Sequence, residues 1–124
     1  MRRHAQSCLP EEACGLLGGQ PGVARRAVPV QNATHSATRF RMDPSEQLAA
    51  MMEIEGAGME IVAIYHSHPL GPSGFSETDV QEAAYREVVH LVWAQQAGVW
   101  GCQGFRLDPA GPSPVRIAVV DTAT

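Results

Sequence analysis

Residues 61–65 form a continuous apolar run that leads directly into His66-Ser67-His68-Pro69. The run consists mainly of β-branched and aromatic residues, a pattern typical of a strand that is covered on both faces. Because side chains alternate along a strand with a period of two, His66 and His68 should project from the same face. We therefore expect a buried strand that carries two histidines on one face and ends at Pro69.

The rest of the chain predicts a strand-rich α+β fold, in which helices interrupt a mixed β-sheet. A length of 124 residues argues for one domain that spans residues 1–124. Apolar runs bounded by turn residues predict further strands at residues 13–18, 23–31, 88–93, 99–107 and 115–121, an extended piece at 39–42, and a helix from Ser76 to about Arg86.

A helix in the middle of the chain has clear start and stop signals. Asp43 is the expected N-cap, Pro44 the first helical residue and Glu46 the capping-box partner. The helix should end near Glu55, before Gly56 and Gly58. The residues expected on or beside one stripe of this helix are Leu48, Met51, Met52 and Glu55.

Composition excludes several classes of function. The chain is 44% hydrophobic and 18% charged, and its nine basic residues are all arginine against thirteen carboxylates. The resulting net charge of −4 argues against a general nucleic-acid or acidic-membrane surface. No apolar run approaches the length of about 20 residues that a membrane span needs.

The cysteines and the first residues of the chain indicate the compartment. Cys8, Cys14 and Cys102 form neither a CxxC motif nor an even-numbered framework, which fits a reducing compartment. The first seven residues lead into no apolar segment of the kind that a secretory signal contains. We therefore expect a cytoplasmic protein.

The two histidines could bind one metal ion, and Zn²⁺ suits imidazole nitrogens. A catalytic zinc site needs a third protein ligand, and Asp79, eleven residues after His68, is the candidate. Simpler readings exist for each piece. An HxH pair on an apolar strand also occurs without a metal, and Ser76 and Asp79 have an obvious structural role as N-cap and capping-box acid.

Taken together, these residues resemble the JAMM motif of the MPN+ metallopeptidases. His66-Ser67-His68-Pro69 and Ser76-Glu77-Thr78-Asp79, with seven residues between His68 and Ser76, match that motif in order and spacing. Glu12-Ala13-Cys14-Gly15-Leu16-Leu17 stands where these proteins carry a glutamate before a short strand. Phe40, with Met42-Asp43-Pro44, is similar to the small stand-alone bacterial members. The resemblance implies an MPN domain whose zinc site lies at the end of a central strand.

The resemblance also implies a role for each motif residue. His66, His68 and Asp79 would ligate one Zn²⁺ per chain, with a water as fourth ligand. Glu12 would act as general base and then as general acid, and Ser76 would hydrogen-bond the oxyanion. Glu11 is a rival for the role of base, and alignment on the following Cys-Gly-Leu-Leu favours Glu12.

The family cleaves peptide or isopeptide bonds after the C-terminal Gly-Gly tail of ubiquitin-like proteins. The small bacterial members are linked to ubiquitin-like sulfur-carrier proteins, so such a tail is the expected substrate. We expect the tail to add as a strand beside the active-site sheet edge. Two alternatives stay open, a non-catalytic MPN-type scaffold and a zinc hydrolase of small amides.

Two further points concern the N-terminal part of the chain. Cys14 could act as a thiol nucleophile, but its apolar strand predicts a core residue. Family members usually have a full helix before the glutamate, whereas residues 1–9 allow only about two and a half turns. A partner subunit could supply the missing packing, so a homodimer is compatible with the sequence.

Overall fold

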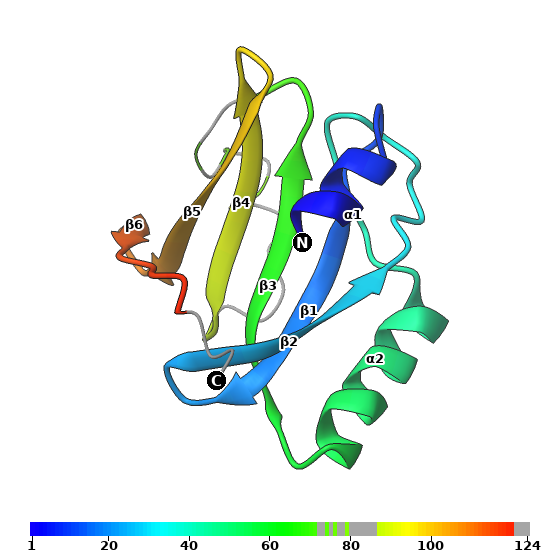
Figure 1. Ribbon diagram of the computed structural model, residues 1–124, viewed down its shortest axis with the longest axis vertical. Helices are drawn as coiled ribbons and strands as arrows, with labels where there is room; N and C mark the ends of the chain where they lie inside the picture. The colour runs from blue at the N-terminus through cyan, green and yellow to red at the C-terminus, as the bar shows by residue number, and fades with distance from the viewer. Residues whose placement is uncertain (72–73, 75, 77–78, 80–86, 121–124) are drawn as a thin grey trace.

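The computed structural model describes residues 1–71, 74, 76, 79 and 87–120. Its elements are α1 (Arg2–Ser7), β1 (Cys14–Gln20), β2 (Val23–Val30), α2 (Pro44–Gly56), β3 (Glu60–His68), β4 (Val89–Gln96), β5 (Val99–Asp108) and β6 (Gly111–Val115). The six strands of this described part form one sheet in the order β2-β1-β3-β4-β5-β6 (Figure 1). β3 and β4 run parallel and the other neighbours antiparallel, so the predicted mixed sheet is confirmed.

The histidine-bearing strand β3 lies at the centre of the sheet, between β1 and β4 (Figure 1). β1 pairs with it as far as His66, which lies opposite Cys14. β4 pairs with it as far as His68, which lies opposite Ala94. Residues 63–68 are all buried, while residues 61 and 62 are half-buried, so the predicted burial of the apolar run holds from residue 63 onward. Both sides of β3 are thus occupied by neighbouring strands up to the two histidines.

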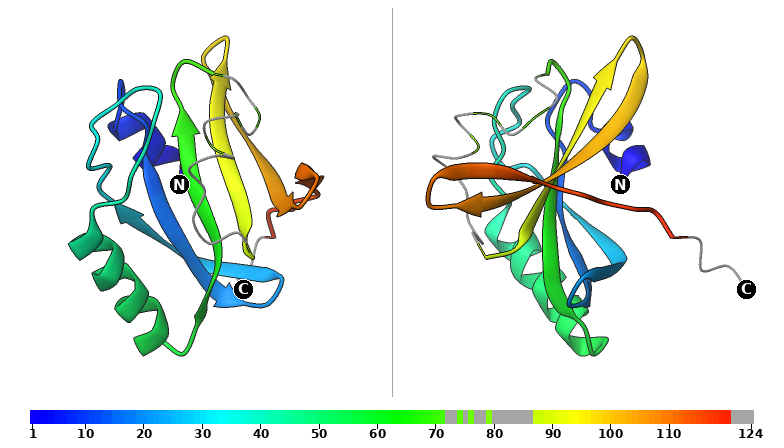
Figure 2. Two further views of the ribbon diagram at one scale, coloured as in Figure 1. Left: turned by 180° about the vertical axis from the view of Figure 1, so that it is seen from behind. Right: turned by 90° about the vertical axis from the view of Figure 1, so that its left-hand side faces the viewer.

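The two helices lie on opposite faces of the sheet (Figure 2). α2 buries Ile54 on one face, against Gly18 of β1, where an added Cβ would come within 2.8 Å of the Ile54 side chain. α1 lies on the other face, where His4 Nδ1 is 2.8 Å from the hydroxyl of Tyr65. Among the described residues, neither helix has the length and apolar character needed to cross a bilayer.

At the start of α2, the predicted N-cap bond of Asp43 is present, but the predicted return bond from Glu46 is not. Asp43 Oδ2 accepts a hydrogen bond from the backbone N–H of Glu46 at 3.0 Å, which confirms the N-cap. The predicted return bond is wrong, because Glu46 Oε1 accepts from the N–H of Gln31 at 2.9 Å. The N–H of Asp43 donates to the carbonyl of Gln31. The Glu46 carboxylate therefore connects α2 to Gln31, the residue after β2, and not to its own N-cap.

The predicted apolar stripe of α2 is also wrong. Leu48 and Met52 are 58% and 64% exposed, whereas Ala50 and Ile54 are buried. The small Ala50 side chain and the glycine opposite Ile54 let the helix approach the sheet closely, and this contact sets which face is buried. Met51 alone of the predicted stripe packs at the edge of this core.

The last strand differs from its predicted position. β6 spans Gly111–Val115, and residues 116–120 form no strand, while residue 121 lies outside the described residues. A tight hairpin pairs Asp108 with Gly111, where φ is 123°. β6 is an edge strand, so Pro112 and Pro114 are tolerated in it because a missing N–H on the solvent side breaks no ladder bond. In the predicted extended piece at residues 39–42, Met42 forms an antiparallel bridge with Asn32, and the piece forms no longer strand.

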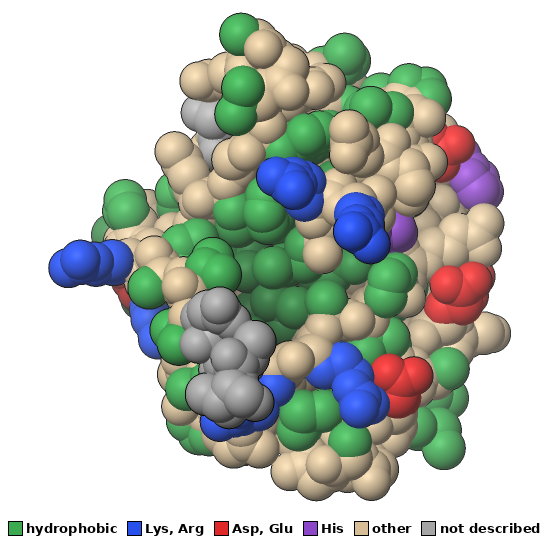
Figure 3. All heavy atoms as spheres, in the orientation of Figure 1, with side chains coloured by type: hydrophobic (Ala, Val, Ile, Leu, Met, Phe, Trp, Pro, Cys, Tyr) green, Lys and Arg blue, Asp and Glu red, His purple; other side chains and the backbone are tan. Residues whose placement is uncertain are grey.

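The α1 face of the sheet contains an apolar hollow (Figure 3). A cluster of buried residues, Leu17, Ala63, Tyr65 and Leu91, lies on this side of the sheet. Basic side chains, all of them arginine, stand around the hollow (Figure 3). Because Tyr65 and His66 are neighbours on one strand, this face is opposite to the one that carries the two histidines.

Candidate metal centre

His66 and His68 come together at the end of β3, as their spacing predicts. Their Nε2 atoms are 3.0 Å apart, and the two residues are 0% and 3% exposed. Two imidazole nitrogens at this separation are close enough to bind one metal ion. A strand positions them because residues two apart share a face.

Asp79 joins the two histidines. Its Oδ2 atom is 3.2 Å from His66 Nε2 and 3.0 Å from His68 Nε2. Ser76 and Asp79 also form the reciprocal bonds of a capping box, from Ser76 N–H to Asp79 Oδ2 at 2.8 Å and from Asp79 N–H to Ser76 Oγ at 3.1 Å. The helical role and the approach to the histidines are therefore compatible. Most of the helix predicted from Ser76 to about Arg86 lies outside the described residues. Asp79, which is described, is helical.

Glu12, and not Glu11, lies beside the histidines. Glu12 is 2% exposed, and one of its carboxylate oxygens lies within 4.8 Å of ligand atoms on both His66 and His68. Glu11 points elsewhere, because its Oε1 atom contacts Nδ1 of the exposed His35 at 3.1 Å. Of the two rival glutamates, only Glu12 has the position that a base acting at this site needs.

The electrostatics of the centre favour a charged Asp79 and a neutral His66. Burial opposes ionisation of Asp79, but the bonds with His66 and His68 outweigh it and hold the pKa of this carboxyl well below its usual range. Burial lowers the pKa of His66, against the opposing effect of Asp79. A neutral imidazole and an ionised carboxylate are the protonation states in which these groups bind a metal.

The donor atoms fit a tetrahedral metal ion. Ligand bonds of 2.0–2.1 Å in a tetrahedral zinc site place donors about 3.3 Å apart, and the three atoms here are 3.0–3.2 Å apart. Two nitrogens and one oxygen also suit zinc and related first-row ions. These residues could therefore hold a metal ion.

Two neighbours of the centre were not among the predicted site residues. Phe40 stacks on the His66 ring, with centroids 4.6 Å apart and an interplanar angle of 23°. Ser67, between the histidines, accepts a hydrogen bond through Oγ from the N–H of Ala13 at 2.7 Å. Both contacts join segments far apart in the chain, so spacing alone could not reveal them, although Phe40 belongs to the pattern quoted above.

Cys14 is a core residue, as its apolar strand predicts. It is 0% exposed, and its Sγ atom donates to the carbonyl of Val30 at 3.3 Å. Burial, with smaller contributions from Cys8, Glu12 and Glu46, raises the pKa of the Cys14 thiol to about 12. The thiol is therefore protonated at neutral pH and has little nucleophilic character.

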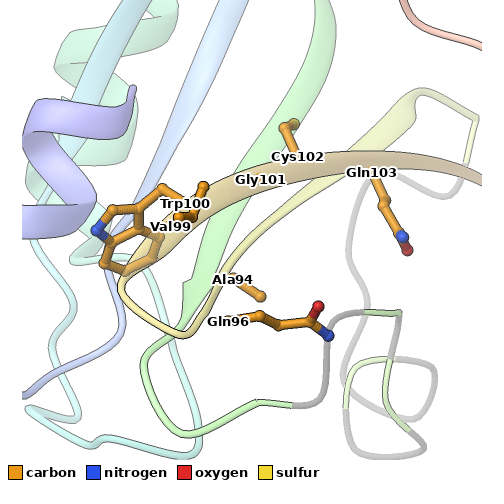
Figure 4. Close-up of a pocket in the computed structure, with 7 residues that line it drawn as sticks. All are labelled: Ala94, Gln96, Val99, Trp100, Gly101, Cys102 and Gln103. Atoms are coloured by element: carbon orange, nitrogen blue, oxygen red, sulfur yellow. The ribbon is translucent and has the colours of Figure 1, made fainter.

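A pocket of about 320 Å³ lies on the β4–β5 hairpin (Figure 4). Its lining residues are Ala94, Gln96, Val99, Trp100, Gly101, Cys102 and Gln103. Ala94 is paired with His68, and Gln103 with Val92, which is itself paired with His66. Paired residues share a face, so this part of the pocket opens on the same face as the histidines.

Residues 1–107 match the family model described as prokaryotic homologs of the JAB domain. The chain belongs to this family. The JAB domain described here thus has the fold and the histidine-bearing central strand that its sequence motifs predict.

Two relatives of this JAB domain are named as a peptidase and a protease. It is 42% identical over 85 residues to the CysO-cysteine peptidase of Mycobacterium tuberculosis, a match that covers 67% of this chain and 58% of the relative. It is 38% identical over 86 residues to a probable TtuB-protein conjugate cleaving protease of Thermus thermophilus, covering 68% of this chain and 57% of the relative. The match therefore spans a little over half the length of these relatives.

Solved structures agree with the fold. A protein from Desulfitobacterium hafniense, determined in solution, has a TM-score of 0.84 at 31% identity, with 94% of this chain and 83% of that chain covered. A JAB1/MPN domain protein from Archaeoglobus fulgidus has a TM-score of 0.56 at 21% identity, with 96% and 89% covered. The second likeness concerns the fold alone, and it supports the MPN architecture expected from the motifs.

Proposed function

We propose that this JAB domain is a zinc metallopeptidase that hydrolyses the amide bond after the C-terminal Gly-Gly tail of a ubiquitin-like protein of the sulfur-carrier type. The observation that carries the proposal is the meeting of His66, His68 and Asp79 within 3.0–3.2 Å of one another beside a buried Glu12. The names of the two relatives, which refer to CysO-cysteine and to TtuB conjugates, support the substrate class.

His66, His68 and Asp79 would hold one zinc ion, which when bound supplies Lewis-acid chemistry, activating water and polarising the scissile carbonyl. Glu12 would take the proton that the attacking water loses. The water oxygen then bonds to the carbonyl carbon, the carbon–nitrogen bond breaks, and Glu12 returns the proton to the leaving amine. A buried carboxylate suits this exchange because it faces little competition from bulk water.

We propose Ser76 as the oxyanion donor. Its Oγ accepts the N–H of Asp79, and a hydroxyl that accepts one bond still has its own proton to donate. That proton would hydrogen-bond the oxygen on which charge develops as the carbonyl carbon becomes tetrahedral. The capping box holds Ser76 beside Asp79, so we propose that one motif serves both the metal and the oxyanion.

The pairing of β3 limits where the tail could add as a strand. A tail cannot add as a strand beside β3, because β1 and β4 already pair with it as far as His66 and His68. The pocket at Ala94 and Gln103 opens on the histidine face, and its lining includes the amide side chains of Gln96 and Gln103 (Figure 4). We propose that the tail crosses the sheet face there on its way to the metal centre.

Two broader expectations accompany this proposal. Residues 1–124 would act as one catalytic domain, supported by the single sheet that connects β1 to β6. A cytoplasmic location is supported by the cysteines, since Cys8, Cys14 and Cys102 are all free thiols. Homodimerisation stays a proposal that sedimentation of the purified protein would test.

The proposal is tested with a panel of conjugates. A sulfur-carrier protein is prepared with cysteine, with a short peptide, or with a lysine side chain joined to its terminal glycine, and each product is followed by mass spectrometry. We expect cleavage after the second glycine that stops with a chelator and returns with Zn²⁺. Cleavage that resists the chelator would overturn the metal mechanism. Binding without cleavage would indicate a scaffold, and cleavage of small amides alone would indicate the other alternative.

A further inference from the structure

Asn32 is a buried polar residue that lies outside the motif. It follows β2 and is 5% exposed, and its side-chain amide acts both as donor and as acceptor. Nδ2 donates to the carbonyl oxygens of Glu12 at 3.1 Å and Arg39 at 3.0 Å, with a longer contact to Ser36 at 3.5 Å. A buried amide with this many partners positions each of them, because every lost bond would leave a polar group unsatisfied.

The backbone of Glu12 is attached to the segment at residues 32–41, which we call the Asn32 loop. The Glu12 carbonyl accepts from Asn32 Nδ2, and the Glu12 N–H donates to the carbonyl of Ser36 at 2.7 Å. Both polar groups of the Glu12 backbone therefore bind this loop. These two bonds hold the Glu12 backbone against the loop, in addition to the bonds between Ala13 and Ser67 on its other side.

The same amide closes the loop around Phe40. Asn32 Oδ1 accepts from the N–H of Arg41 at 3.1 Å, while Nδ2 holds the carbonyl of Arg39. These bonds anchor the residues on both sides of Phe40, whose ring stacks on His66. One side chain thus connects the backbone of Glu12 to the aromatic ring that packs against a histidine of the metal centre.

Asn32-Ala33-Thr34 has the form of a glycosylation sequon, but hydrogen bonds within the fold explain why Asn and Thr occur at this spacing. Asn32 Oδ1 accepts from the N–H of Thr34 at 3.1 Å and from its hydroxyl at 2.6 Å, which is the bonding of an Asx-type turn. The amide nitrogen is buried and already donates to backbone carbonyls. The pattern is accounted for by the turn that orients the Asn32 side chain.

We propose that Asn32 is a positioning residue that places Glu12 and the Phe40–His66 pair for catalysis. This inference rests on the proposed function for its kinetic consequence. The structural consequence, a fixed Glu12 backbone, can be measured without activity. A displacement of about 1 Å can cost on the order of a hundredfold in rate, so loss of these bonds should lower kcat much more than it raises KM.

The test replaces Asn32 by aspartate. Asn32→Asp keeps size and shape and can still accept from Thr34 and Arg41, but it cannot donate to the carbonyls of Glu12 and Arg39. We expect kcat to fall by about 10- to 100-fold with KM within about threefold and with zinc content unchanged. Amide hydrogen exchange, followed by NMR, should accelerate at Glu12 and Ala13 more than in the sheet strands.

Thr34→Val is the matched control. It removes the Thr34 hydroxyl, which contacts Asn32 Oδ1 at 2.6 Å and the Arg39 carbonyl at 3.2 Å, and leaves both Nδ2 donors of Asn32 in place. We expect kcat within about threefold of wild type and no selective exchange at Glu12. If Asn32→Asp does not fold, Asn32→Ser, which keeps one donor, is measured in the same way.

Three outcomes would overturn the inference. The first is a kcat for Asn32→Asp within twofold of wild type, and the second is exchange that accelerates uniformly over the whole chain. The third is an equal loss of kcat in Thr34→Val. If the wild-type protein cleaves no conjugate, the proposed function fails, and the selective exchange at Glu12 and Ala13 still decides whether Asn32 positions that segment.

Discussion

Ser67 accepts a hydrogen bond through Oγ from the backbone N–H of Ala13 at 2.7 Å, and its own N–H donates to the Ala13 carbonyl at 3.0 Å. Ser67 lies between the two histidines, and Ala13 follows Glu12. The pair therefore connects the end of β3 to the start of β1 at the point where the proposed base and the proposed ligands meet. This connection makes the relative position of Glu12 and the histidines a property of the sheet register.

Metal binding should stabilise the protein. His66, His68 and Asp79 are buried with their donor atoms 3.0–3.2 Å apart, so Zn²⁺ should bind the folded state far better than the unfolded chain. At a free concentration 100-fold above Kd the gain is about 2.7 kcal/mol, which for a domain of this size raises Tm by about 10 °C. Thermal unfolding of metal-free protein with and without Zn²⁺ measures this shift.

His68→Ala should abolish that stabilisation. The control is His35→Ala, which removes an exposed histidine that contacts Glu11 outside the centre. We expect this control to keep the full rise in Tm. A rise that persists in His68→Ala would show that zinc binds elsewhere, and it would contradict the assignment of the ligands.

Gly15→Ala should destabilise the fold. A Cβ at Gly15 would clash with the ring and hydroxyl of Tyr65, which is 1% exposed and bonded to His4. A buried aromatic ring cannot move aside cheaply, so we expect a loss of about 1–3 kcal/mol in the free energy of unfolding. Urea denaturation of the purified variant measures it.

Gly56→Ala is the matched control for that substitution. An added Cβ at Gly56, the last residue of α2, would meet nothing within 4 Å. We expect no loss and a gain of up to about 1 kcal/mol, because alanine costs less backbone entropy than glycine in a helix. Equal effects of the two substitutions would contradict the packing of Tyr65 against β1.

His4 should make stability depend on pH. Burial, and then the N-terminal ammonium, lower its pKa from the ordinary value of 6.5. The folded state therefore favours neutral His4, and its contribution is present above pH 6.5 and is lost as the pH falls through the folded pKa. We expect urea denaturation of metal-free protein to show a smaller loss between pH 7.5 and 5.5 in His4→Gln than in wild type.

The control for His4 is the comparison between pH 7.5 and 8.5, where His4 is neutral in both states. The two proteins should then change equally. Burial also lowers the pKa of His66. Because His66 is present in both proteins, its effect on the free energy of unfolding cancels when wild type and His4→Gln are compared. An identical acid loss in wild type and His4→Gln would show that α1 does not bury this histidine.

Cys14 should be inert and dispensable for turnover. Its pKa of about 12 leaves almost no thiolate at pH 7.5, and its thiol is buried. We expect iodoacetamide to leave Cys14 unmodified in native protein and to modify it after denaturation in urea. Cys14→Ala should keep kcat within about fivefold of wild type. A loss above a hundredfold in a folded variant would instead favour a thiol mechanism.

Much of the fold follows from local patterns. The apolar run at residues 61–65 predicts β3, and Asp43 with Pro44 predicts the start of α2, because both signals depend only on neighbouring residues. The buried face of α2 depends instead on Gly18, a residue of β1. β6 was misplaced because Pro112 and Pro114 are unusual in a strand, and only an edge position accommodates them.

The candidate site divides in the same way. A spacing of two predicts that His66 and His68 share a face, and the structure brings their Nε2 atoms within 3.0 Å. The contacts of Ser67 and Asn32 with the segment at Glu12 join residues 54 and 20 positions apart. Such contacts depend on which strands pair and in which register, and a single sequence does not contain that information in any local pattern.

The most direct test of the account compares Glu12→Gln with Glu11→Gln in zinc-loaded protein, with conjugate cleavage and zinc content measured on the same samples. Glu12 is buried beside the histidines and Glu11 is turned toward His35, so the two neighbours should differ completely. We predict that Glu12→Gln binds one zinc per chain and loses at least about a thousandfold in kcat, within the range expected when general acid–base catalysis is removed. Glu11→Gln should keep kcat within about threefold. Turnover retained in zinc-loaded Glu12→Gln would contradict the account.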